Sequence, residues 1–178
     1  MLRGGWRSLA LAVLCCAFMA DSRAQSRVKL SPREAGLQKI LKAFADEKKV
    51  KGTTYAVAFV DLNEDGDKEA IVYFTNAGWC LTGGCTTLIL TPTKTAAGPS
   101  FEIMSMLLAI YTPIRVLDSK TNGWHELATG IPGGESAISY NGLRYPGGWY
   151  AARRLPKGVP GTVVLDSKAE IHSVEGLP

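Results

Sequence analysis

Oxygen-bearing side chains occupy five alternate positions within nine residues of the segment VDLNEDGDKEAIV, which runs from Val60 to Val72. They are Asp61, Asn63, Asp65, Asp67 and Glu69. Carboxylates at such close spacing repel one another unless a positive charge lies among them. The chemistry that this pattern indicates is the binding of a hard cation through oxygen ligands.

The order of these residues is typical of a calcium loop. Side-chain oxygens of the first, third and fifth residues converge on one point, and the glycine that follows permits the sharp reversal of the chain. The seventh residue, Asp67, offers its backbone carbonyl, and the ninth, Glu69, closes the shell. An EF-hand is excluded, because its twelfth position needs a bidentate glutamate and here holds Val72. We therefore expect Ca²⁺; the alternative is an acidic hairpin loop without a metal.

The same loop resembles the strand–loop–strand calcium turn of FG-GAP and VCBS-type repeats, whose pattern is D-x-N-x-D-G-x-x-D/E. The resemblance covers the loop alone, and the loop occurs once in the chain. It implies a calcium ion that stabilises a hairpin.

The compartment is indicated by residues 1–24, which read as a secretory signal peptide. A positively charged start precedes the apolar run SLALAVLCCAFMA, and Ser22-Arg23-Ala24 forms a small-x-small cleavage site. The mature chain is then expected to begin at Gln25, in the periplasm or outside the cell, with no membrane span after cleavage. An uncleaved anchor and a lipoprotein attached through Cys15 or Cys16 are the alternatives.

The charge of the chain argues against nucleic acid as a partner. Loss of three arginines and one aspartate with the signal lowers the net charge from +4 to +2. This is too small an excess for a nucleic-acid-binding surface. The remaining length suits one domain with one core, which we place at residues 25–155, followed by a tail or weak hairpin at 156–178.

Two cysteines remain outside the signal, Cys80 and Cys85, on either side of LTGG. In an exported protein we expect them to form a disulfide. A pair of buried thiols is the alternative, and a zinc site has weaker support because no second Cys or His pair lies nearby.

The elements that must position the loop are one helix and several strands. Ser31 and Glu34 form a capping box before an apolar stripe at helical spacing, which predicts an amphipathic helix over 31–48. From Thr53 onward six to eight short strand-like segments alternate with Gly- and Asn-rich turns, and Asn141-Gly142 is a hairpin signal. The expected fold is mainly β, an antiparallel meander or propeller-like sheet with one N-terminal helix.

A second cluster of interest lies in GIPGGESAISYNGLRYPGG, where glycines surround a short segment with aromatic and basic residues. Tyr and Arg are enriched in binding hot spots, and Gly-rich loops often present recognition residues. We select Ser136, Tyr140 and Arg144 as partner-binding residues. The alternative is that the aromatic side chains cap the core.

A family resemblance connects these features. An exported domain with one VCBS-like turn, a close cysteine pair and the segments TNGWHEL and YNGLRYP is similar to small periplasmic lysozyme inhibitors and to immunity proteins against peptidoglycan-cleaving toxins. The resemblance runs from about residue 53 to 146. It implies a Ser and a Tyr that enter the cleft of a hydrolase. Ser136 and Tyr140 match these two positions, but Ala137 stands where such inhibitors have glycine.

The sequence contains no motif that supports catalysis, so we expect a binding protein and not an enzyme. No nucleophile motif or HExxH sequence is present. Glu126 and Glu135 would be needed as a carboxylate pair for sugar hydrolysis, but solvated roles are expected for both. The expected partner is a lysozyme or another peptidoglycan hydrolase; the competing function is a calcium-binding structural or ligand-binding envelope protein without a hydrolase partner.

Overall fold

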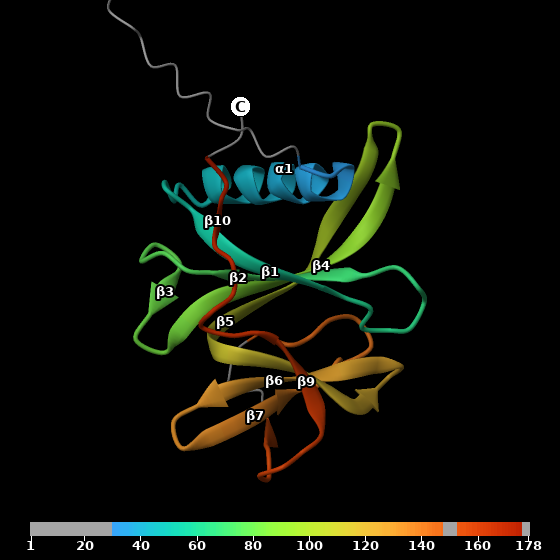
Figure 1. The fold of residues 1–178 in the computed structure, drawn as a ribbon, viewed down its shortest axis with the longest axis vertical. Helices are drawn as coiled ribbons and strands as arrows, with labels where there is room; N and C mark the ends of the chain where they lie inside the picture. Colours follow the sequence, from blue (N-terminus) through green and yellow to red (C-terminus); the bar gives the residue numbers. More distant parts are fainter. Residues whose placement is uncertain (1–29, 148–152, 176–178) are drawn as a thin grey trace, which may run out of the picture.

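The computed structural model describes residues 30–147 and 153–175 and shows one helix above a long, twisted antiparallel sheet (Figure 1). The predicted signal peptide lies outside the described residues. The elements are α1 (Pro32–Glu47), β1 (Thr54–Val60), β2 (Glu69–Phe74), β3 (Cys80–Leu81), β4 (Gly84–Thr95), β5 (Gly98–Thr121), β6 (Trp124–Ile131), β7 (Gly134–Ile138), β8 (Arg153–Arg154), β9 (Gly161–Leu165) and β10 (His172–Ser173).

The sheet is an open meander. Its strands follow the order β10-β1-β2-β4-β5-β6-β7-β8, with β3 beside β4 and β9 beside β5. Neighbours pair antiparallel, as the short predicted connections require. The predicted fold class, mainly β with one N-terminal helix, is confirmed. The strand count exceeds the prediction because β3, β8 and β10 have two residues each, too few to show a period.

Helix α1 begins and packs as its sequence predicts. The Ser31 hydroxyl accepts a hydrogen bond from the Glu34 N–H, and the Glu34 carboxylate accepts one from the Ser31 N–H, which completes the capping box. On its inner face Leu37 and Leu41 are fully buried against the first half of the sheet. The helix therefore docks on the sheet through its apolar face.

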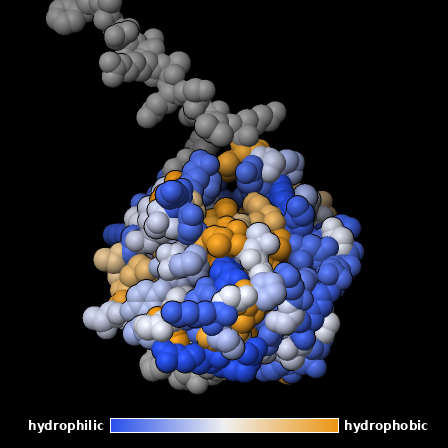
Figure 2. Space-filling model, turned by 60° about the horizontal axis from the view of Figure 1, so that its bottom comes forward, coloured by the Kyte–Doolittle hydropathy of each residue, from blue (hydrophilic) through white to orange (hydrophobic). Residues whose placement is uncertain are grey.

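Strand β5 joins two halves of the molecule. Its first part pairs with β4 and its second part with β6 and β9. One core lies under α1 and contains the stacked rings of Phe44, Phe74 and Trp79. A second core lies on the opposite face of β1, β2 and β4, continues onto β5, β6, β7 and β9, and includes Leu62 and Tyr145. Figure 2 shows apolar side chains in a hollow on one face, surrounded by hydrophilic ones.

Two segments differ from the sequence prediction. For residues 156–178 a tail or a weak hairpin was expected; within the described part, β9 pairs with β5 and β10 with β1, and the two strands do not pair with each other. Asn141-Gly142 does form a tight turn, since the Asn141 N–H donates to the Arg144 carbonyl. However, β7 ends at Ile138 and no strand pairing flanks the turn within the described residues.

Candidate functional site

The acidic loop, residues 61–68, connects β1 to β2 and is ordered by its own side chains. The Asp61 carboxylate accepts hydrogen bonds from the backbone N–H groups of Glu64 (2.6 Å) and Gly66 (2.9 Å). Glu64 and Gly66 have φ of 62° and 92°, the left-handed conformation that the reversal requires. Desolvation acts to raise the pKa of Asp61, but the Gly66 and Glu64 N–H donors lower it below its ordinary 3.8. Asp61 therefore carries its charge in the folded loop.

The middle of the loop continues this pattern of local bonds. The Asp65 N–H donates to the Asn63 side-chain carbonyl, and the Asp67 N–H donates to the Asp65 carboxylate at 2.8 Å. The Asn63 amide also donates to Asp65 at 2.8 Å. Asp65 and Asp67 are exposed to solvent. The side chains of Asn63 and Asp65 thus bond to the backbone of the loop itself.

Glu69, the first residue of β2, is the buried end of the loop. Its side chain is 1% exposed, and one carboxylate oxygen accepts a hydrogen bond from the Leu62 N–H at 2.8 Å. Burial raises the pKa of Glu69; the Leu62 N–H opposes this rise, and the charges of Asp65 and Asp61 add to it. Asp61 and Asp65 are therefore close enough to Glu69 to disfavour the charged form of its carboxyl group.

Within the described part of the chain, no three His, Cys, Asp or Glu side chains are placed so that they could hold a metal ion. In this arrangement the loop carboxylates accept bonds from backbone amides. Calcium at the five predicted ligands stays a prediction, which rests on the type and spacing of the oxygen donors.

The acidic loop is joined to the hairpin of β5 and β6 at several points. Glu64 pairs with Lys120 (2.6 Å between Nζ and the carboxylate) and lies 3.3 Å from Nε2 of His125. The His125 N–H donates to the Leu62 carbonyl at 2.8 Å. The Tyr145 hydroxyl donates in turn to the His125 carbonyl at 2.6 Å. A continuous set of hydrogen bonds therefore runs from Glu69 through Leu62 and His125 to Tyr145.

The predicted recognition segment divides into a buried part and an exposed part. Ser136 is 2% exposed and its hydroxyl has no hydrogen-bond partner among the described residues. As placed, this hydroxyl faces the interior and is not presented to a partner. Arg144 is exposed, and the neighbouring Leu143 is 82% exposed. Sequence reasoning missed Leu143, although its place directly after Asn-Gly at a turn tip was a usable signal.

Tyr140 lies between these two parts. Its ring stacks on Trp124, with centroids 4.7 Å apart, and meets Tyr145 edge to face at 5.5 Å. The Asn122 side-chain amide donates to the Tyr140 carbonyl at 2.9 Å. Tyr140 is half-buried. It thus packs in an aromatic cluster and retains an accessible edge.

A second buried carboxylate, Glu126, was expected to be solvated, and this expectation is wrong. Glu126 is 5% exposed and accepts hydrogen bonds from the hydroxyls of Ser119 (2.6 Å), Thr121 (3.3 Å) and Ser139, and from Arg153 at 3.1 Å. Burial acts to raise its pKa, but these hydroxyls and the Arg153 charge lower it below its ordinary 4.5.

Glu135, the other member of the candidate hydrolytic pair, has different partners. Its carboxylate pairs with Arg115 at 2.7 Å. Glu126 and Glu135 are therefore each paired with a different arginine, Arg153 and Arg115.

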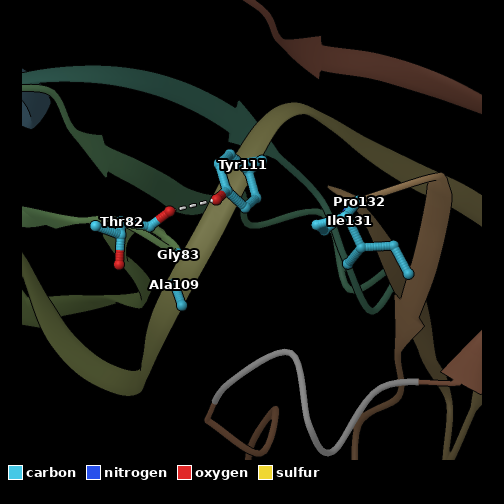
Figure 3. Close-up of a pocket in the computed structure, with 6 residues that line it drawn as sticks. All are labelled: Thr82, Gly83, Ala109, Tyr111, Ile131 and Pro132. Carbon is cyan, nitrogen blue, oxygen red and sulfur yellow. Dashed lines mark hydrogen bonds between the residues drawn. The ribbon is translucent and has the colours of Figure 1, made fainter.

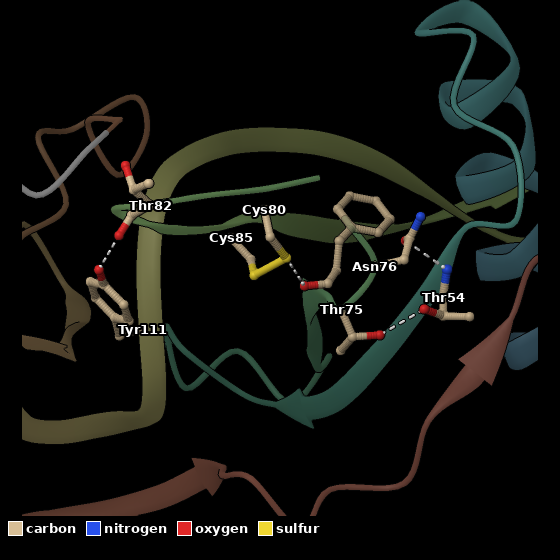
Figure 4. Close-up of a disulfide and its surroundings, with 8 residues drawn as sticks. Thr54, Thr75, Asn76, Cys80, Thr82, Cys85 and Tyr111 are labelled. Carbon is tan, nitrogen blue, oxygen red and sulfur yellow. Dashed lines mark hydrogen bonds between the residues drawn. A yellow bond between two sulfur atoms is a disulfide. The ribbon is translucent and has the colours of Figure 1, made fainter. Parts of the chain in front are cut away.

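The predicted disulfide is confirmed. Cys80 and Cys85 are directly opposite each other on β3 and β4 and are bonded, with an S–S distance of 2.08 Å (Figure 4). The Tyr111 hydroxyl donates to the Thr82 carbonyl at 2.7 Å, which holds the disulfide-closed turn against β5.

The same turn forms one wall of an open pocket of about 410 Å³. Figure 3 shows Thr82 and Gly83 on one side, Ala109 and Tyr111 on β5, and Ile131 and Pro132 on the opposite side. None of the predicted calcium or partner-binding residues lines this pocket.

Comparison with known proteins identifies no relative. No family model, no curated protein and no solved structure matches this chain. Among residues 30–147 and 153–175, no helix has the length and apolar character needed to cross a membrane. The function must therefore be argued from the geometry of the sites.

Proposed function

We propose that this chain is an exported, calcium-stabilised binding protein that inhibits a peptidoglycan-degrading enzyme. The observation that carries the inhibitory part is the turn at residues 141–144. One side-chain oxygen of Asn141 accepts hydrogen bonds from the N–H groups of both Leu143 (3.0 Å) and Arg144 (2.9 Å). An exposed apolar side chain and an exposed cation thus stand together on a turn that is already folded.

The base of this turn is fixed on both sides. Before it, Tyr140 stacks on Trp124. After it, the Tyr145 side chain is fully buried, and its backbone N–H donates to the Ser105 hydroxyl at 3.0 Å. A segment held in this way loses little conformational entropy on binding. Arg144 would supply the charge complementary to the catalytic carboxylates of a glycoside-cleaving cleft.

The support for calcium comes from Glu69. This carboxylate is buried and accepts a hydrogen bond from a backbone N–H. Among the described residues it forms no ion pair with a cationic side chain. It also lies close to the charges of Asp61 and Asp65. A divalent cation bound by Asp61, Asn63, Asp65, the carbonyl of Asp67 and Glu69 would supply the missing positive charge. Through Leu62 and His125 it would also hold the Tyr145 base of the turn.

The experiment that tests this function is an inhibition assay in the presence of calcium, with a chicken-type lysozyme and a lytic transglycosylase acting on cell walls. The wild-type chain should inhibit at least one of them. Arg144→Glu should weaken inhibition by roughly a hundredfold, as expected for a charge reversal at an interface hot spot. Lys157→Glu, the same reversal at an exposed lysine outside this turn, is the control and should inhibit normally.

Two outcomes would count against inhibition. If the wild-type chain inhibits neither enzyme, the envelope-protein alternative without a hydrolase partner becomes the better account. If Arg144→Glu and Lys157→Glu lose inhibition equally, the effect is one of overall charge and the turn is not the contact. Circular dichroism of each variant shows whether it is folded as the wild type is.

A further inference from the structure

A groove of about 490 Å³ lies beside the end of the acidic loop. Its walls come from the start of α1, the end of the acidic loop and the hairpin of β4 and β5. The lining residues are Arg33, Gly66, Asp67, Lys68, Pro92, Thr93, Lys94, Pro99, Ser100 and Phe101. None of the residues predicted to bind a partner is among them.

The charges in this groove are not balanced. Its lining contains three cations, Arg33, Lys68 and Lys94, and one carboxylate, Asp67, so the lining residues carry an excess of two positive charges. Among the described residues, none of the three cations forms an ion pair with a carboxylate. Three cations in the lining of one groove, none paired with a carboxylate, raise the local positive potential and attract anions.

The groove is also preformed. The Arg33 guanidinium lies 4.1 Å from the Phe59 ring centroid, and one of its N–H groups donates to the Lys68 carbonyl at 2.6 Å. This contact leaves its other N–H groups free of hydrogen bonds to described residues. At Gly36 a Cβ atom would lie 2.3 Å from the Pro99 carbonyl oxygen, so α1 and the hairpin meet backbone to backbone. These contacts fix the walls before any ligand arrives.

We propose that this groove binds a small polyanion, a molecule that carries two or more phosphate or carboxylate groups. Arg33 offers a planar set of donors for an oxyanion, and Lys68 and Lys94 offer point charges. The hydroxyls of Thr93 and Ser100 can donate hydrogen bonds to the same ligand. The volume lies within the range of small-molecule sites. The proposal depends neither on calcium nor on a hydrolase partner.

The test is isothermal titration of the full mature chain with two probes, pyrophosphate and citrate, in low-salt buffer passed over a chelating resin. Removal of divalent metals matters because both probes also bind calcium. The wild-type chain should bind at least one probe saturably, at one site. The probe that binds more tightly distinguishes phosphate-bearing ligands from carboxylate-bearing ones.

The variant Lys68→Gln/Lys94→Gln should bind that probe about tenfold more weakly, because two exposed ion pairs are lost. The matched control is Lys39→Gln/Lys51→Gln, which removes the same charge from two exposed lysines outside the groove and should bind within about twofold of wild type. Absence of saturable binding by the wild-type chain, or equal losses in the two variants, would overturn the proposal. A fold check by circular dichroism accompanies each titration.

Discussion

Glu69 and Glu126 are both buried carboxylates, and their surroundings are opposite. Glu126 accepts bonds from three hydroxyls and from Arg153, and its pKa is lowered. Glu69 accepts one from a backbone N–H, lies near two further carboxylates, and has a raised pKa. The first site is complete within the chain. The second has no cationic side chain as a partner among the described residues, and it is the place where the proposed calcium ion would add a positive charge.

The largest effect on stability is expected at Glu126. Glu126→Ala should lower the free energy of unfolding by about 3 kcal/mol, because it leaves three hydroxyls and Arg153 without their shared acceptor. Ser119→Ala, which removes only one donor, should cost about 1 kcal/mol. Urea denaturation of both variants measures the difference. A loss below about 1 kcal/mol for Glu126→Ala would show that this network does not hold the second half of the sheet.

The next prediction concerns pH, which should change the stability contributions of Glu69 and Glu126 in opposite directions. The folded-state pKa of Glu69 is raised above its ordinary 4.5. Its contribution to stability is therefore present below pH 4.5 and is lost as the pH rises through the folded pKa. In metal-free buffer at pH 7, Glu69→Gln should melt about 3 °C above wild type, because it removes an unfavourable charge and retains an acceptor for the Leu62 N–H.

The pKa of Glu126 is lowered, so the sign is reversed. Its contribution to stability is present above pH 4.5 and is lost as the pH falls through the folded pKa. Wild type should lose stability in acid more steeply than Glu126→Gln does. Melting curves of wild type and both Gln variants between pH 3 and 8 test this, and parallel curves for the two variants would remove the contrast between the sites.

The smallest effect is expected where the acidic loop meets the hairpin of β5 and β6. Glu64 is exposed and pairs with Lys120 and His125. Glu64→Gln should shift the melting temperature by less than about 2 °C, since exposed ion pairs contribute little. The backbone bond between His125 and Leu62 is unaffected by this change. A larger shift would show that the side-chain pair, and not this backbone bond, holds the loop in place.

The parts of this structure that could be predicted from the sequence are those fixed by neighbouring residues. The capping box at Ser31 and Glu34, the turn at Asn141 and the disulfide of Cys80 with Cys85 each depend on residues a few positions apart. Short-range chemistry determines such features. The meander could be predicted as well, because the connections between the strands are short and short connections join antiparallel neighbours.

The parts that could not be predicted depend on residues distant in the chain. Glu126 is buried because Ser139 and Arg153 arrive from other strands and loops to bond it. Ser136 was placed at a partner surface because it lies in a Gly-rich segment and matches the serine of the inhibitor pattern, but its burial depends on the pairing of β7 with β6 and β8. The pairing of β10 with β1 joins residues more than a hundred positions apart.

The measurement that tests the central claim most directly is a melting curve of the mature protein in metal-free buffer and with calcium. A ligand that binds only the folded state stabilises it by about 2.7 kcal/mol when present at a hundred times its Kd. We predict a rise of about 8 °C in the melting temperature of wild type. Asp65→Ala should show no rise, whereas Asp118→Ala, an exposed aspartate outside the loop, should respond as wild type does. Equal melting temperatures of wild type with and without calcium would contradict the claim and leave residues 61–69 as an acidic turn.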